Sequence, residues 1–151
     1  GRSTCWLLQN ALADDGAIIC IDPWNFTPNQ HTELTGQQVF ETFLDNTGEV
    51  FKPGQSLFPV RETSISALPK IAPISADFIY VDGSHDPSVA LQDGCLAWEL
   101  LKAGGVMLFD DYQYPHEPTG DGIDRFLDHH KGKYEIIVNN YQLGVKKCAQ
   151  S

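Results

Sequence analysis

Basic residues are scarce in this chain of 151 residues, which has 10 Lys and Arg against 20 Asp and Glu. The formal net charge is −10 at pH 7. Such a charge repels a polyanion rather than attracting it. We therefore expect no nucleic-acid partner, and the simplest interpretation of the charge is a solvated acidic surface.

Long apolar runs and paired cysteines are also missing. No run approaches the ~20 apolar residues that a membrane span needs, and no signal-peptide pattern is present. The four cysteines are far apart and form no C-x-x-C pair: Cys5, Cys20, Cys95 and Cys148. This pattern favours reduced thiols. The sequence thus predicts a soluble, cytoplasmic protein without a membrane partner.

Internal repeats, linkers and low-complexity tracts are absent as well. The content of 42% hydrophobic and 20% charged residues is typical of a globular protein. We expect a single domain over residues 1–151. The chain does not begin with Met, and a helical pattern over 5–13 follows almost at once, with Ser3 or Thr4 as its N-cap and Asp15-Gly16 closing it.

Three short apolar runs stop abruptly at acidic residues. They are residues 17–21 before Asp22, residues 78–81 before Asp82, and residues 105–109 before Asp110 and Asp111. Runs of β-branched and aromatic residues are typical of strands buried on both faces, as in parallel sheets. Ligands of open α/β sheets bind at the carboxyl ends of the strands, so these acids are the first candidates for chemistry.

The clearest helical pattern lies between the second and third runs. Asp86 is the expected N-cap, Pro87 the first helical residue and Gly104 the stop. A strand, a helix and a strand within ~30 residues predict a right-handed crossover that makes the two strands parallel neighbours.

The remaining elements complete an α/β pattern. We expect helices over 37–46, 66–71 and 122–130, a loop over 25–36, a strand over 57–60, and antiparallel strands over 134–140 and 141–147. The predicted fold is a doubly wound, mostly parallel sheet that ends in an antiparallel hairpin.

The acids of the second and third runs are candidate metal ligands. Neighbouring strands lie ~4.8 Å apart, so Asp82, Asp110 and Asp111 would converge. A bound cation, a shared proton or a cationic ligand would relieve their repulsion. An all-oxygen site favours Mg²⁺. Alternatively, these acids cap loops or face water.

Two further residues are candidates for substrate chemistry. His85, three residues after Asp82, could accept a proton from a substrate hydroxyl, although an ordinary turn histidine is the alternative. Asp22 could accept hydrogen bonds from the hydroxyls of a ribose, or it could form a turn with Pro23. The loop from Tyr112 to Gly120 would be a substrate lid or a plain connection.

Five segments together resemble class I S-adenosylmethionine-dependent methyltransferases, and more narrowly the family-24 group. They are residues 1–4, 20–24, 78–85, 97–112 and 141–147, whereas residues 25–56 match poorly. The resemblance implies a Rossmann-like fold. It also implies methyl transfer from S-adenosylmethionine to a small-molecule acceptor, with a hydroxyl group as the expected target.

The resemblance also implies site residues. The implied S-adenosylmethionine-binding residues are Gly1, Ser3, Thr4, Asp22, Trp24, Thr63, Ser64 and Asp82. Gly1 would end the glycine-rich loop of the family. In related O-methyltransferases of the catechol and macrocin types, acids that match Asp82, Asp110 and Asp111 hold a divalent metal. Ser84 replaces an acid that is thought to be the base in macrocin-type enzymes, which leaves His85 as the nearest substitute. The catalytic candidates are therefore His85 and Asp82.

The family's first, central strand should precede Gly1, so we expect an N-terminally truncated methyltransferase-like domain. The alternatives are a metal-dependent nucleotide-sugar transferase, or a truncated domain that keeps the fold without turnover.

Overall fold

The structure is a computed structural model that describes residues 1–25, 28, 33–71 and 75–149. The chain divides into two compact units, unit 1 (Gly1–Thr63) and unit 2 (Ser64–Ser151). Among the described residues, no helix has both the length and the apolar character that crossing a membrane requires. The expectation of a single domain stays a prediction.

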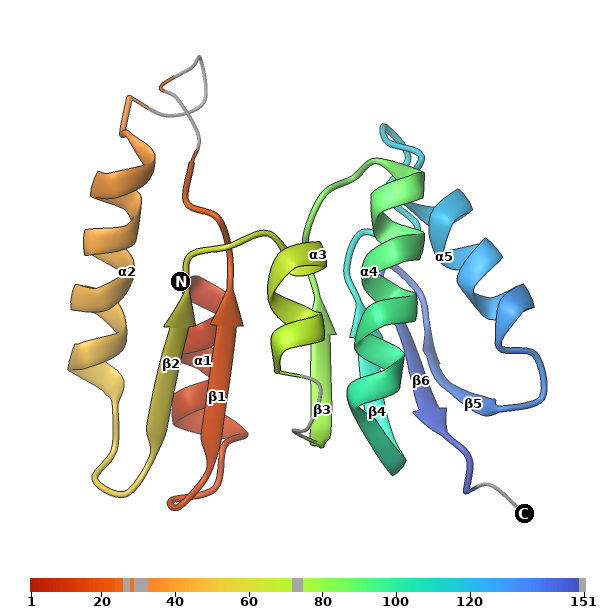
Figure 1. Ribbon diagram of the computed structural model, residues 1–151, viewed down its shortest axis with the longest axis horizontal. Coiled ribbons are helices and arrows are strands. Elements are labelled where there is room, and N and C mark those ends of the chain that lie inside the picture. The colour runs from red at the N-terminus through yellow and green to blue at the C-terminus, as the bar shows by residue number, and fades with distance from the viewer. Residues whose placement is uncertain (26–27, 29–32, 72–74, 150–151) are drawn as a thin grey trace. The chain divides into compact units, whose positions relative to one another are not determined.

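Unit 1 has two parallel strands, which alternate with two helices along the chain. Its elements are α1 (Arg2–Asn10), β1 (Ala17–Ile21), α2 (Gly36–Val50) and β2 (Ser56–Val60). Ala17 lies opposite Ser56, and Ile21 opposite Val60. Both arrows point the same way in Figure 1. The expected strand over 57–60 is therefore confirmed, whereas most of the expected loop over 25–36 falls outside the described residues.

The helix boundaries in unit 1 differ from the prediction. Gly1, not Ser3 or Thr4, is the N-cap of α1, and no side chain caps this helix. The helix also ends at Asn10 rather than at Asp15-Gly16, and the side-chain amide of Asn10 donates to the carbonyl of Trp6 at 2.9 Å.

Helix α2 runs past its expected end. It begins at a capping box, in which the Thr35 hydroxyl accepts from the Gln38 amide at 3.3 Å and the Gln38 side chain accepts from the Thr35 amide at 2.9 Å. The buried hydroxyl of Thr47 donates to the Phe43 carbonyl at 2.8 Å. This satisfied hydroxyl keeps Thr47 inside the helix, and Gly48 does not end it.

Unit 2 has a four-stranded mixed sheet. Its elements are α3 (Ser64–Ala67), a 3₁₀ turn (Leu68–Lys70), β3 (Ala76–Val81), α4 (Pro87–Leu100), β4 (Leu101–Phe109), α5 (Thr119–His129), β5 (Tyr134–Asn139) and β6 (Leu143–Lys147). The strand order is β3-β4-β6-β5. The pair β3–β4 is parallel and β6 is antiparallel to both its neighbours, so the predicted crossover and hairpin are confirmed.

Helices α4 and α5 lie side by side on one face of this sheet (Figure 1). Between them and the strands, Trp98, Phe109 and Phe126 form the aromatic part of the core, with the rings of Phe109 and Phe126 4.9 Å apart. The two helices approach closely because Gly122 of α5 lies under the carbonyl of Pro87, where a Cβ atom would be only 2.1 Å from the oxygen. This contact holds the start of α4 against α5.

Among the described residues, β1 pairs only with β2, and β3 pairs only with β4. The expectation that a further strand precedes Gly1 stays a prediction.

Candidate active site

The acids that end β3 and β4 lie together. Val81 is in register with Phe109, and the amide of Asp110 continues the ladder by donating to the Val81 carbonyl at 3.0 Å. Asp82, Asp110 and Asp111 each offer a carboxylate oxygen, and these oxygens lie within 4.8 Å of one another. The parallel register therefore produces the convergence that the sequence predicts.

The last of these acids has an unusual backbone. Asp111 is buried and has a φ of 52°, in the left-handed region that side chains other than glycine rarely adopt. Such conformations persist only where the surrounding structure holds them, and they cluster at functional sites. The contacts of Asp111 are therefore part of what holds the site.

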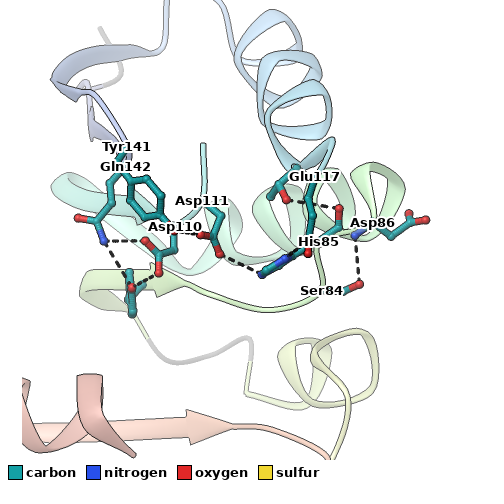
Figure 2. Close-up of polar contacts among 10 residues, drawn as sticks. Ser84, His85, Asp86, Asp110, Asp111, Glu117, Tyr141 and Gln142 are labelled. Atoms are coloured by element: carbon teal, nitrogen blue, oxygen red, sulfur yellow. Dashed lines mark hydrogen bonds and ion pairs between the residues drawn. The ribbon is translucent and has the colours of Figure 1, made fainter. Parts of the chain in front are cut away.

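Hydrogen-bond donors surround the two acids that follow β4. Asp110 accepts from the Tyr80 hydroxyl at 2.8 Å and from the side-chain amide (Nε2) of Gln142 at 2.8 Å, one on each oxygen. Asp111 accepts from the Tyr141 hydroxyl on one oxygen and faces His85 with the other (Figure 2). The hydrogen bond to Asp111 raises the pKa of Tyr141 to about 12, so the phenol keeps its proton.

Asp82 is more exposed than its two neighbours. Partial desolvation of its carboxylate, and the charges of Asp110 and Asp111, raise the pKa of Asp82. Negative charge is therefore costly at this point of the cluster, and a bound cation would relieve the part of that cost that comes from the neighbouring acids.

His85 lies between two carboxylates. Its Nε2 is 2.9 Å from Asp111, and its Nδ1 contacts Glu117 from the loop before α5. A carboxylate only accepts hydrogen bonds, so each ring nitrogen of His85 faces a group to which it could donate. Figure 2 shows His85 bridging the Asp111 side of the cluster and the Glu117 loop. A role as base requires one of these contacts to open.

A buried carboxyl lies beside this cluster. Asp93 of α4 is 8% exposed, and its Oδ1 accepts from the Ser64 hydroxyl at 2.5 Å. Asp93, Asp82 and His85 line the same small hollow, which has the apolar side chains of Phe109 and Ile123 in its wall. Burial raises the pKa of Asp93, and the hydrogen bond from Ser64 offsets part of that rise.

This raised pKa predicts a pH dependence of folding. The folded protein holds the Asp93 proton more tightly than the unfolded chain, so wild-type stability falls as the pH rises from below 3.8 through the raised value. Asp93→Asn keeps a carbonyl oxygen for Ser64 and removes this loss. We expect urea unfolding to show a more stable variant at neutral pH and equal stabilities below pH 3.8. A gain confined to acidic pH would contradict this assignment.

Six of the eight residues predicted to bind S-adenosylmethionine lie in unit 1, and Ser64 and Asp82 lie in unit 2. Gly1 caps α1, and Ser3 and Thr4 lie in its first turn, with the Thr4 hydroxyl 3.6 Å from the sulfur of Cys20. Asp22 forms the turn with Pro23 that its sequence motif allows, because its Oδ1 accepts from the backbone amide of Trp24 at 2.6 Å.

Trp24 lies in an aromatic cluster rather than at an open surface. It is 6% exposed, and its ring is 4.9 Å from Phe40 and 5.1 Å from Phe43. Thr63 and Ser64 stand where unit 1 ends and unit 2 begins. Of these two, Ser64 has its hydroxyl committed to Asp93.

Four polar partners of the acid cluster were not identified from the sequence: Tyr80, Glu117, Tyr141 and Gln142. Side chains alternate between the two faces of a strand, so Tyr80 lies on the same face of the sheet as Asp82. This spacing could have identified Tyr80 from the sequence. The pairing of Phe109 with Leu143 brings Tyr141 and Gln142 to the acids. No pattern in the sequence points to Glu117.

Comparison with known proteins gives a family and a fold. The profile of methyltransferase family 24, described as a methyltransferase domain, matches residues 1–112. No curated protein matches the sequence.

Three solved structures are similar in fold. A protein from Corynebacterium glutamicum has 16% identity and a TM-score of 0.64, covering 94% of this chain and 65% of its own. The O-methyltransferase from Bacillus cereus in complex with S-adenosylhomocysteine (SAH) has 15% identity and a TM-score of 0.63, covering 97% and 70%. The MycE methyltransferase of the mycinamycin biosynthetic pathway, in complex with Mg, SAH and mycinamycin VI, has 13% identity and a TM-score of 0.56, covering 97% and 48%.

This chain therefore spans 65% of the first of these structures and 48% of the third. The likenesses confirm the predicted α/β, Rossmann-like fold class. The family profile covers residues 1–112 and includes the ends of both β3 and β4, where the acids lie. The chain belongs to the class I S-adenosylmethionine-dependent methyltransferases, in methyltransferase family 24.

Proposed function

We propose that this protein transfers a methyl group from S-adenosylmethionine to a hydroxyl of a small-molecule acceptor, with a divalent metal held by Asp82, Asp110 and Asp111. The observation that carries the proposal is the convergence of these three carboxylates at the ends of two neighbouring parallel strands. Family membership supports the cosubstrate, and the Mg in the MycE complex supports the metal.

The three acids fit a hard divalent cation. Their oxygens lie within 4.8 Å of one another. Ligands of an octahedral Mg²⁺ lie about 3 to 4 Å apart, given metal–oxygen bonds of about 2.1 Å. With a small adjustment of the side chains, Asp82, Asp110 and Asp111 would hold such a cation. A bound cation would orient the acceptor hydroxyl and lower its pKa.

The surrounding side chains prepare this site for methyl transfer. The sulfonium of S-adenosylmethionine supplies an already activated methyl group, so the protein has to align the acceptor oxygen and remove its proton. Tyr80 and Gln142 fix both oxygens of Asp110. Phe109 and Ile123 line a hollow together with His85 and Asp111, and apolar walls strengthen a polar contact made inside it, such as the one between His85 and Asp111.

His85 is the proposed proton acceptor. When Glu117 withdraws, the proton on Nδ1 passes to solvent, and the neutral ring keeps its other proton on Nε2, which it donates in a hydrogen bond to Asp111. The lone pair on Nδ1 is then free to take the proton of the acceptor hydroxyl. Opening of the Glu117 loop is thus part of the proposed function, as expected for a lid.

We assign cosubstrate binding to the residues that the family resemblance implies: Gly1, Ser3, Thr4, Asp22, Trp24, Thr63, Ser64 and Asp82. Asp22 has the most direct role, because its Oδ2 is not used in the turn with Trp24 and can accept from a ribose hydroxyl.

Asp22→Asn tests this assignment. The variant keeps a carbonyl oxygen for the Trp24 amide but loses the charge, and hydrogen bonds to charged groups contribute about 1.5–3 kcal/mol. We expect SAH affinity to fall by about 10- to 100-fold, measured by calorimetry. Asp15→Asn is the matched control, since it changes an exposed acid before the same strand, β1. Equal losses in both variants would refute a specific role for Asp22.

The function as a whole is tested by calorimetry with SAH, followed by methyl-transfer assays with a panel of small hydroxyl compounds, each with and without Mg²⁺. We expect SAH binding and a transfer rate that rises with Mg²⁺. Binding of a nucleotide sugar in place of SAH, or of neither ligand, would count against the proposal. Binding without transfer would identify a domain that keeps the cosubstrate site alone.

A further inference from the structure

We propose that the turn between β5 and β6 is a support for the metal site, in which Tyr141 and Gln142 are positioning residues that hold Asp111 and Asp110. The inference rests on the proposed metal-dependent function. It adds two residues from a hairpin that lies outside the matched family region, which ends at residue 112.

Strand register brings this turn to the acids. β6 is antiparallel to β4, and Leu143 pairs with Phe109. The residues before Leu143 therefore stand beside the residues after Phe109, which places Gln142 at Asp110 and Tyr141 at Asp111. The Gln113 amide donates to the Tyr141 carbonyl at 3.2 Å, which extends this alignment beyond the strands.

The turn itself is held by its own hydrogen bonds. The Asn140 amide donates to the Gln142 carbonyl at 3.0 Å, and the Gln142 amide donates to Asn140 Oδ1 at 3.0 Å. The side chains of Tyr141 and Gln142 consequently extend from a backbone that is held in place. Donors on such a backbone can orient a carboxylate, whereas donors on an unrestrained loop would move together with the carboxylate.

The contacts leave room for a cation. A carboxylate oxygen has two lone pairs, so an oxygen that accepts one hydrogen bond can still coordinate a metal. Gln142 contacts Oδ1 of Asp110, and Tyr141 contacts Oδ1 of Asp111 (Figure 2). Both donors also offset the repulsion between the two acids before a cation arrives. Partners of this kind, around a metal ligand, set its orientation, and their loss typically lowers metal affinity about 10- to 100-fold.

The test is Mn²⁺ binding, followed by electron paramagnetic resonance in the presence of SAH. Tyr141→Phe removes only the hydroxyl, and Gln142→Met keeps the length of the side chain without its donor. We expect each variant to bind Mn²⁺ about 10- to 100-fold more weakly than wild type, with SAH affinity and the unfolding midpoint unchanged. Because Tyr141 is 48% exposed, its substitution leaves the core intact.

Tyr112→Phe is the matched control. Its hydroxyl also donates to an aspartate, Asp124, at 2.8 Å, but away from the three acids. Mn²⁺ affinity should match wild type in this variant. Wild-type protein that binds SAH without Mn²⁺ would overturn both the metal function and this inference. Wild-type Mn²⁺ binding with equal or tighter binding in Tyr141→Phe and Gln142→Met would overturn the inference alone, and tighter binding would identify the turn as a competitor of the metal.

Discussion

Asp82→Asn is expected to abolish Mn²⁺ binding and to lower metal-supported methyl transfer on the order of 100-fold or more, since a bound metal supplies several kcal/mol and each 1.36 kcal/mol is about tenfold in rate. The substitution is isosteric and removes one of three carboxylates that lie within 4.8 Å of one another. The measurements are the metal affinity, by Mn²⁺ titration, and the initial rates of methyl transfer at saturating S-adenosylmethionine.

The same variant should not lose stability. Desolvation and the charges of Asp110 and Asp111 raise the pKa of Asp82, so a neutral side chain relieves repulsion in the folded protein at neutral pH. We expect an unfolding midpoint equal to or above that of wild type. A protein that loses activity while gaining stability is the signature of a strained functional site.

Asp77→Asn is the control for this experiment. Asp77 lies on the same strand, β3, is exposed, and pairs with Lys102 at 2.8 Å. Metal binding and transfer should be unchanged in this variant. If Asp82→Asn retained wild-type Mn²⁺ affinity, the assignment of the metal to the ends of β3 and β4 would be wrong.

Gly122→Ala is expected to destabilise unit 2 by about 3 kcal/mol, the upper part of the usual cost of overpacking. The new Cβ would lie 2.1 Å from the carbonyl oxygen of Pro87, which is backbone at the start of α4 and cannot rotate away. Helices α4 and α5 would have to separate, and the core around Phe126 would open with them. Urea unfolding followed by circular dichroism measures the loss.

Gly48→Ala is expected to have the opposite effect on stability, a gain instead of a loss. Gly48 is also inside a helix, α2, but a Cβ there would meet nothing within 4 Å. Alanine is favoured over glycine in a helix by about 1 kcal/mol, so this variant should be more stable than wild type. Similar effects of the two substitutions would show that helix propensity, not the contact with Pro87, decides the result at Gly122.

The sequence predicts the start and the topology of the central supersecondary unit because these signals are local. The expected stop at Gly104 is wrong, since α4 ends at Leu100 and Gly104 lies within β4. Asp86 and Pro87 start α4 where expected, and the Asp86 side chain accepts from the amides of Ser88 and Val89. The apolar runs on each side are strands that need no other partner to be recognised. Since a crossover of this length makes parallel neighbours, the meeting of Asp82 with Asp110 follows from the sequence.

Other features depend on contacts that are distant in sequence. The sequence pattern predicts a helix over 37–46, whereas α2 continues to Val50. Thr47 and Gly48 both have low helix propensity, but the buried hydroxyl of Thr47 is satisfied within the helix. Asp93 looks like a solvent-facing helical acid, yet Ser64, 29 residues away, supplies its hydrogen bond. Glu117 reaches His85 across 32 residues. Such pairs require the three-dimensional arrangement, which composition and periodicity do not encode.

The antiparallel direction of β6 has a consequence for engineering. A strand running parallel to β4 would present its end to the acids, and that end would have to continue into a crossover. Because β6 runs the opposite way, a short reversal of the chain faces the acids instead, with Asn139 and Leu143 paired behind it. Residues 140–142 can therefore be varied as an exchangeable cassette, in a library that samples cation preference while β3, α4 and β4 keep their wild-type sequence.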